Sequence, residues 1–342
     1  MTTVALVGRE AEMEAAGRLL ASAEAGVGGG LLVVGEAGIG KTRLLVEVSD
    51  RAEAMGFAVL TGRSAPGGGT YRALSEAVLA HLRSTGSLDA PSLRPYRAAL
   101  GQLAPGWESQ AAGPSPPNGA DPVVVLGEGL LRLLILAGGA GAGCLLVLED
   151  LHWADPDTVG IVGYLATAAL GLPVVIAVSA WDDQPGALRT LRPADSVVAS
   201  LSRRPGVTTV WLGRLEDGAV AELAMVHAGT RPVEDTTLAT LIVHADGLPV
   251  LVEDLLDGFL DDPSAKASVP RTLTAPGRAA DGGTGRRCAT RLAGRSPARR
   301  RAGLVAARAA DRVGWHRRFY GSAGRHRQRA AQPAGCAADV AA

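Results

Sequence analysis

The chain has 342 residues, of which 47% are hydrophobic and 20% charged, and its formal net charge is zero. This is the composition of a globular protein with enough apolar material for a core, and it excludes a chain that is disordered throughout. No apolar run approaches the roughly 20 residues of a membrane-spanning helix, and the N-terminus has no signal-peptide pattern, so we expect a cytoplasmic protein. Cys144, Cys288 and Cys336 are too scattered for a disulfide framework or a metal site.

The zero net charge conceals two different segments. Residues 1–270 contain 18 Lys and Arg against 31 Asp and Glu, a net charge of −13, whereas residues 271–342 contain 16 Arg and three Asp, a net charge of +13. Such a split indicates either a basic arm for nucleic acid or two segments of different origin.

Short apolar runs predict the strands of a parallel sheet. The run at 31–34 stops at a glycine-rich turn and a helical pattern follows directly, which indicates strand, loop and helix. Runs of the same kind, without polar alternation, recur at 57–60, 144–148, 174–178 and 207–212. Strands of this kind require helices on both faces of the sheet. We therefore expect an α/β fold with a doubly wound parallel sheet.

Helix breakers and capping residues place the segments between and after these strands. Residues 104–122 are rich in Pro and Gly and predict a surface loop. Asp155 followed by Pro156 predicts a helix that begins there and runs to about residue 170. From 216 to 260 the pattern is helical only, with a break at 246–249, and it predicts a C-terminal helical lid. The expected domains are a core at 1–214, the lid at 215–272 and a tail at 273–342.

The loop after the first strand carries the strongest chemical signal. It matches G-x-x-x-x-G-K-[ST], the pattern of phosphate-binding P-loops, and it lies between a strand and a helix as that mechanism requires. Lys41 is expected to reach the β- and γ-phosphates and the Thr42 hydroxyl to bind Mg²⁺, while backbone N–H groups surround the phosphates. The expected cofactors are ATP and Mg²⁺. The expected nucleotide-binding residues of the loop are Gly35, Glu36, Ala37, Gly38, Ile39, Gly40, Lys41 and Thr42.

Two carboxylates follow the apolar run at 144–148 and supply the acidic partner that a P-loop needs for its metal. One of Glu149 and Asp150 is expected to hold Mg²⁺ through water and the other to orient the attacking water, but the sequence does not assign the two roles. Both are therefore candidate metal ligands beside Thr42 and candidate catalytic residues beside Lys41. The alternative is that either carboxylate only caps the following turn.

Other polar residues near these motifs have weaker signals. Arg9 either touches the nucleotide or pairs with acidic neighbours. His152 is expected to be a packed turn residue, because phosphoryl transfer does not require an imidazole. Three arginines are interpreted as solvated surface charges rather than as arginine fingers; they are Arg203, Arg204 and Arg214.

The segment L-E-D-L-H-W-A-D at 148–155 resembles the second nucleotide motif of the AAA-like signal-transduction ATPases, the STAND group. That group includes the large LuxR-type transcriptional regulators and the Orc1-like ATPase domain family. The resemblance covers residues 4 to about 272 and includes V-G-R-E at 7–10, L-G-R-L at 212–215 and G-L-P at 247–249. It implies a nucleotide switch, with slow hydrolysis coupled to movement of the lid. It also adds Arg9 and Pro249 to the expected nucleotide-binding residues.

The chain departs from this family pattern in three places, one of which is Glu149, where many relatives have aspartate. After the fourth strand, where relatives often have arginine, it has V-S-A-W at 178–181. After a V-P-R-T-L element at 269–273, where relatives continue into helices and a helix-turn-helix, the hydrophobic periodicity fades. A shifted reading frame in a GC-rich gene explains this tail, and the competing interpretation is a basic arm that binds nucleic acid through phosphates. We favour the frameshift because the tail lacks aromatic interleaving or a helical pattern.

The expected function is that of the ATP–Mg²⁺ switch of a LuxR-type regulator that lacks its effector domains. Its expected partner is ATP or ADP, and no membrane partner is expected. One alternative is a nucleotide-binding scaffold without turnover. Another is a protein that contacts DNA through the basic tail or through a missing effector domain. The sequence does not decide whether the chain forms a homo-oligomer.

Residues from about 274 to 342 are expected to pack poorly and to be dispensable for nucleotide binding. This stretch has few large apolar side chains, so burial cannot offset the roughly 1–2 kcal/mol per residue lost when a backbone is ordered. Limited proteolysis with trypsin should leave a core that ends near Arg271 and binds ATP with the parental affinity. A tail that resists trypsin, or a truncated core that unfolds, would contradict this expectation.

Overall fold

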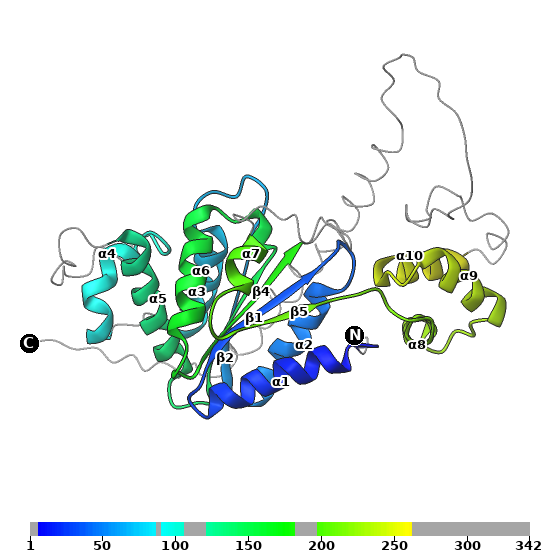
Figure 1. Cartoon of the computed structure of the whole chain (residues 1–342), viewed down its shortest axis with the longest axis horizontal. Coiled ribbons are helices and arrows are strands. Elements are labelled where there is room, and N and C mark those ends of the chain that lie inside the picture. The colour runs from blue at the N-terminus through cyan, green and yellow to red at the C-terminus, as the bar shows by residue number, and fades with distance from the viewer. Residues whose placement is uncertain (1–5, 87–89, 106–120, 182–196, 262–342) are drawn as a thin grey trace, which may run out of the picture. The chain divides into compact units, whose positions relative to one another are not determined.

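The computed structural model describes residues 6–86, 90–105, 121–181 and 197–261, which Figure 1 draws as coloured ribbon. By its internal contacts the chain divides into two units, Met1–Ala275 and Pro276–Ala342, and the described residues belong to the first. The expected tail therefore lies outside the described residues. No helix within the described ranges is long and apolar enough to cross a membrane.

The described residues form a five-stranded parallel sheet with the strand order β2-β3-β4-β1-β5. All the predicted apolar runs are confirmed as strands; they are β1 (Gly29–Gly35), β2 (Phe57–Arg63), β3 (Gly143–Glu149), β4 (Val174–Trp181) and β5 (Val207–Trp211). Gly35 at the end of β1 lies in register with Trp181 of β4, and Arg63 of β2 with Glu149 of β3. The carboxyl ends of these strands therefore lie along one edge, where α/β sheets bind ligands.

Helices cover both faces of this sheet, as predicted (Figure 1). Successive side chains of a strand point to opposite faces. Leu31 and Val33 of β1 pack in a cluster with α1 (Glu10–Glu24) and α2 (Lys41–Ala54), whereas Leu32 and Val34 belong to a second cluster. Further elements contribute to this second cluster; they are α3 (Arg72–Thr85), the 3-10 helix η1 (Pro91–Tyr96), α4 (Arg97–Leu100), α5 (Pro122–Gly138), α6 (Pro156–Ala168) and α7 (Val197–Ser202).

The predicted cap of α6 is confirmed. The Asp155 carboxylate accepts a hydrogen bond from the backbone N–H of Thr158 at 3.0 Å, and Pro156 is the first helical residue. A second Asp-Pro pair begins α5 at Pro122, which was the last residue of the predicted loop. The central part of that loop, residues 106–120, lies outside the described residues.

After β5 the described chain is helical only, as predicted, and contains α8 (Asp217–Ala228), α9 (Asp235–Ala245) and α10 (Pro249–Asp261). The predicted break before α10 is confirmed, because Asp246 and Gly247 both have positive φ angles, 47° and 71°. These helices share a hydrophobic cluster of their own, which also includes Val7 from the N-terminal segment. Chain segments from both ends of the described region therefore meet in this cluster.

Gly62 in β2 lies so close to α3 that a Cβ atom would be 1.9 Å from the carbonyl oxygen of Ala73. Because that oxygen belongs to the backbone of a packed helix, we expect Gly62→Ala to lower the free energy of unfolding by about 1–3 kcal/mol. Gly258 in α10 is the matched control, since a Cβ there would meet nothing within 4 Å. Gly258→Ala is expected to be neutral or to stabilise by up to about 1 kcal/mol. Equal urea-unfolding curves for the two variants would contradict the close approach of β2 and α3.

Candidate functional site

The loop between β1 and α2 depends on two glycines with left-handed backbone. Gly38 has a φ angle of 79° and Gly40 one of 101°, values that residues with a side chain rarely adopt. A Cβ atom on Gly38 would also lie 2.4 Å from a methyl carbon of Val250 in α10. These two glycines thus allow the backbone to turn directly into the N-terminus of α2, where backbone N–H groups favour binding of an anion.

Lys41 is a buried cation in the first turn of α2. Its side chain reaches back to the start of the loop, where Nζ donates hydrogen bonds to the carbonyl oxygens of Gly35 at 3.0 Å and Glu36 at 2.9 Å. Burial lowers the pKa of Lys41, and the negative charges of Asp150 and then of Glu36 oppose that shift. Phosphate oxygens beside this ammonium would favour its charged form further. The surroundings of Lys41 therefore fit a polyphosphate ligand.

Thr42 and Glu149 meet although they are 107 positions apart in the sequence. The Thr42 hydroxyl donates a hydrogen bond to Oε2 of Glu149 at 2.5 Å. A hydroxyl and a carboxylate are oxygen ligands that suit Mg²⁺, which binds proteins through few side chains together with phosphates and water. No group of three or more His, Cys, Asp or Glu in the described ranges could hold a metal by itself. These residues therefore fit a Mg²⁺ ion that arrives with a phosphate ligand.

Asp150 has different partners from Glu149. Its backbone is left-handed, with a φ angle of 56°, and its N–H donates to Oγ of Ser179 at 3.0 Å. Its Oδ2 accepts hydrogen bonds from Nε and Nη2 of Arg63, at 2.8 and 2.6 Å. The two adjacent carboxylates thus lie at the same edge of the sheet but contact different residues. Arg63 was not predicted from the sequence, where its one signal is its place shortly after the apolar run at 57–60.

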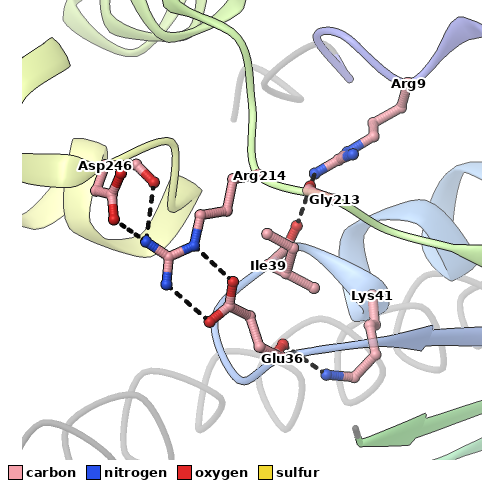
Figure 2. Close-up of polar contacts among 7 residues, drawn as sticks. All are labelled: Arg9, Glu36, Ile39, Lys41, Gly213, Arg214 and Asp246. Atoms are coloured by element: carbon pink, nitrogen blue, oxygen red, sulfur yellow. Dashed lines mark hydrogen bonds and ion pairs between the residues drawn. The ribbon is translucent and has the colours of Figure 1, made fainter. Parts of the chain in front are cut away.

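Arg214 is an exposed charge, as interpreted, and it also forms ion pairs. Figure 2 shows its guanidinium between the loop and the segment before α10. Nε and Nη2 donate to the two carboxylate oxygens of Glu36, at 2.8 and 3.0 Å, and Nη1 donates to the carboxylate of Asp246. This side chain thus connects the loop with the chain turn between α9 and α10. The sequence feature that singles out Arg214 is its place within the L-G-R-L element at 212–215.

Arg9 also holds the loop from the N-terminal side (Figure 2). It is only 6% exposed, and its Nη2 donates to the carbonyl oxygens of Gly213 at 2.6 Å and Ile39 at 3.4 Å. Nη1 pairs with Glu12 at 3.4 Å, so the predicted contact with an acidic neighbour is present as well. Burial lowers the pKa of Arg9, and Glu12 opposes that shift. The main contacts of Arg9 are with the backbone around the loop.

Pro249 lies beside the loop at the beginning of α10. Its Cγ would be 4.0 Å from a Cβ atom placed on Gly40, and the N–H of the next residue, Val250, donates to the carbonyl oxygen of Gly38 at 3.4 Å. The sequence-predicted residues Arg9 and Pro249 are therefore brought to the same loop as Lys41.

His152 is a packed turn residue, as predicted. It lies in the 3-10 turn η2 (Leu151–Trp153), and its Nδ1 accepts a hydrogen bond from the backbone N–H of Trp181 at 3.2 Å. Its ring centroid lies 5.0 Å from that of Trp153 and 5.8 Å from that of Trp181. Of the other two arginines, Arg203 is exposed, as interpreted, whereas Arg204 is half-buried and packs against Gly163 of α6.

A family model described as an AAA ATPase domain matches residues 5–176 of the chain. No curated protein matches the sequence. Among solved structures, the T158V variant of Thermotoga maritima RuvB is 13% identical, with a TM-score of 0.41 over 76% of this chain and 64% of that one. Domain III of the Thermotoga maritima replication initiation protein DnaA is 13% identical, with a TM-score of 0.40 over 79% and 91%.

A structure of Drosophila ORC bound to DNA is 14% identical, with a TM-score of 0.38 over 78% of this chain and 60% of that one. The chain thus spans less than two thirds of the RuvB and ORC chains.

Glu36 and Arg214 are expected to be energetically coupled. Their side chains are 39% and 35% exposed, so solvent screening limits the expected coupling free energy to about 1 kcal/mol. In a double-mutant cycle by urea unfolding, Glu36→Gln and Arg214→Gln together should destabilise by less than the sum of the two single effects. The matched control is the pair of Glu14 and Arg18 on α1, which is 71% and 66% exposed and should show weaker coupling. Strictly additive effects of Glu36→Gln and Arg214→Gln would contradict the contact.

Proposed function

The chain belongs to the family of AAA ATPase domains, and we propose that it binds ATP with Mg²⁺ in the loop between β1 and α2 and hydrolyses it slowly as a switch. Nucleotide binding follows from the family. The more specific proposal rests on the position of the buried Lys41 directly before Thr42, whose hydroxyl contacts Glu149. Lys41 suits phosphate oxygens, and the Thr42–Glu149 pair suits the metal ion that accompanies them.

The different contacts of the two carboxylates support a division of roles. Thr42 and Glu149 would hold Mg²⁺, which when bound neutralises charge on the phosphates. The negative charge of Asp150 favours the charged form of Lys41, whereas its neighbour Glu149 contacts the Thr42 hydroxyl. We therefore assign Glu149 to the metal and Asp150 to the orientation of the attacking water.

The contacts between the loop and the helices after β5 support a switch rather than a simple binding site. Arg214 joins Glu36 of the loop to Asp246, and Val250 donates to Gly38. A change in the loop on nucleotide binding would therefore act directly on the segments that lead into α8 and α10. Together with the L-E-D-L-H-W-A-D and G-L-P elements, this favours a signalling or transcriptional regulator of the LuxR type.

A second candidate function is a scaffold that holds a nucleotide without turnover. The observation that favours it lies at the end of β4, where this chain has Ser179 and Trp181 and no arginine. The Ser179 hydroxyl contacts the backbone of Asp150, and Trp181 contacts His152. A single-turnover hydrolysis assay with Mg²⁺ separates the two functions, because the scaffold would return ATP unchanged.

Lys41→Ala is expected to weaken ATP binding at least about tenfold, equivalent to about 1.4 kcal/mol, because it removes the cation that contacts the phosphates. The measurement is a titration with ATP and Mg²⁺ by calorimetry. Arg18→Ala is the control, since Arg18 is an exposed cation on α1, and it should bind ATP like the parent. An unchanged affinity for Lys41→Ala would overturn the assignment of the loop.

Replacement of both Glu149 and Asp150 by Ala is expected to abolish Mg²⁺-dependent hydrolysis while leaving much of the nucleotide binding. The reason is that the loop amides and Lys41 remain when both carboxylates are removed. Hydrolysis and binding are measured on the same preparation, with and without Mg²⁺. Hydrolysis at the parental rate would mean that the acidic residues of the reaction lie elsewhere.

A further inference from the structure

Glu36 places a carboxylate inside the loop that is proposed to bind phosphates. It follows Gly35, at a position where the P-loop pattern requires no particular side chain. Its carbonyl oxygen accepts a hydrogen bond from Lys41 at 2.9 Å. Burial lowers the pKa of Lys41, and the negative charges of Asp150 and then of Glu36 oppose that shift. A carboxylate close enough to favour the charge of Lys41 also repels a phosphate group that contacts Lys41. Glu36 therefore brings a charge that opposes the proposed ligand.

The guanidinium of Arg214 covers this carboxylate with two hydrogen bonds. Nε donates to Oε1 of Glu36 at 2.8 Å and Nη2 donates to Oε2 at 3.0 Å, so each carboxylate oxygen has its own N–H donor (Figure 2). Two parallel hydrogen bonds of this kind are the strong form of contact between arginine and a carboxylate. Nη1 donates to the carboxylate and to the carbonyl oxygen of Asp246. The positive charge of Arg214 thus lies directly against the negative charge of Glu36.

The backbone on both sides of Arg214 is held in place. The carbonyl oxygen of Gly213 accepts a hydrogen bond from Arg9 at 2.6 Å, and the N–H of Leu215 donates to the carbonyl oxygen of Gly247 at 2.8 Å. A Cβ atom on Gly247 would lie 2.9 Å from that of Arg214 and 2.4 Å from the carbonyl oxygen of Leu215. The chain after β5 therefore passes close to the turn before α10, and Arg214 lies between two anchored neighbours.

We propose that Arg214 supports ATP binding by neutralising the carboxylate of Glu36, so that the charge of Lys41 dominates where the phosphates bind. Arg214 does this without contacting the nucleotide. Because Arg214 also contacts Asp246, a movement of the segment before α10 that withdraws the guanidinium would expose the charge of Glu36 and weaken ATP binding. By linkage, bound ATP would favour the paired arrangement by the same free energy. This inference rests on the proposed function, because it requires that the loop binds ATP.

The experiment measures the affinity of full-length variants for ATP with Mg²⁺ by calorimetry at 0.1 M salt. Arg214→Gln is expected to weaken ATP binding about three- to tenfold, because the charge of Glu36 is then uncompensated and only partly screened by solvent. Arg214→Lys, which keeps the charge, should recover most of the affinity. Arg132→Gln is the matched control, since Arg132 pairs with Glu128 within α5 at a similar exposure; it should bind ATP like the parent.

A double-mutant cycle in ATP affinity tests whether Arg214 acts through Glu36. Glu36→Gln alone should bind ATP at least as tightly as the parent, because the repelling charge is removed. Adding Arg214→Gln to Glu36→Gln should then change the affinity by less than about twofold. If the double variant loses as much affinity as Arg214→Gln alone, the proposal is overturned, because Arg214 then contacts the nucleotide itself or holds the shape of the loop.

The dependence on salt separates a charge effect from a change in the shape of the loop. The Debye length falls from about 10 Å at 0.1 M salt to about 3 Å at 1 M. The affinity deficit of Arg214→Gln relative to the parent should therefore shrink to less than about twofold at 1 M salt. A deficit of the same size at both salt concentrations contradicts the neutralising role.

The remaining outcomes are also decisive. If Arg214→Gln does not fold, as circular dichroism would show, the test passes to Glu36→Gln, for which an affinity below that of the parent overturns the inference. A parental affinity for Arg214→Gln at 0.1 M salt overturns it as well and leaves the proposed ATP binding intact. A parent that does not bind ATP overturns both the proposed function and the role of Arg214.

Discussion

The buried ammonium of Lys41 is the interaction on which the rest of the site depends. A buried charge is unfavourable unless other groups stabilise it, and the carbonyl oxygens of Gly35 and Glu36 and the charge of Asp150 do so. These groups come from the end of β1, from the loop after it and from the end of β3. The strands must therefore end at the same edge, and the strand order must bring β3 within reach of β1.

That strand order places β4 between β3 and β1, so the carboxylates reach the loop past the end of β4. Ser179 of β4 is buried there, and its hydroxyl accepts the N–H of Asp150 as the chain leaves β3. A larger side chain at this position would displace the turn that separates Glu149 from Asp150. The left-handed backbone of Asp150 then lets two adjacent carboxylates contact Thr42 and Arg63, which approach from different elements.

The sequence was sufficient to predict the strands and the loop because both signals are local. Buried parallel strands are continuous apolar runs, and the glycines and Lys41 stand at fixed spacing within one segment. The partners of Arg63 and Arg214 could not be predicted because they lie 87 and 178 positions away in the sequence. The different contacts of Glu149 and Asp150 could not be predicted either, since they depend on one φ angle and on the strand order.

Glu36 is the residue through which the buried ammonium and the helices after β5 are connected. Its carbonyl oxygen accepts a hydrogen bond from Lys41, while its carboxylate holds Arg214, which also contacts Asp246 before α10. A phosphate group that draws Lys41 toward itself must change the contact with this carbonyl. Because the same residue carries the ion pair with Arg214, such a change would be passed through Glu36 and this ion pair to the segment after β5. If the chain acts as the proposed switch, the nucleotide and these helices would be connected by a short route.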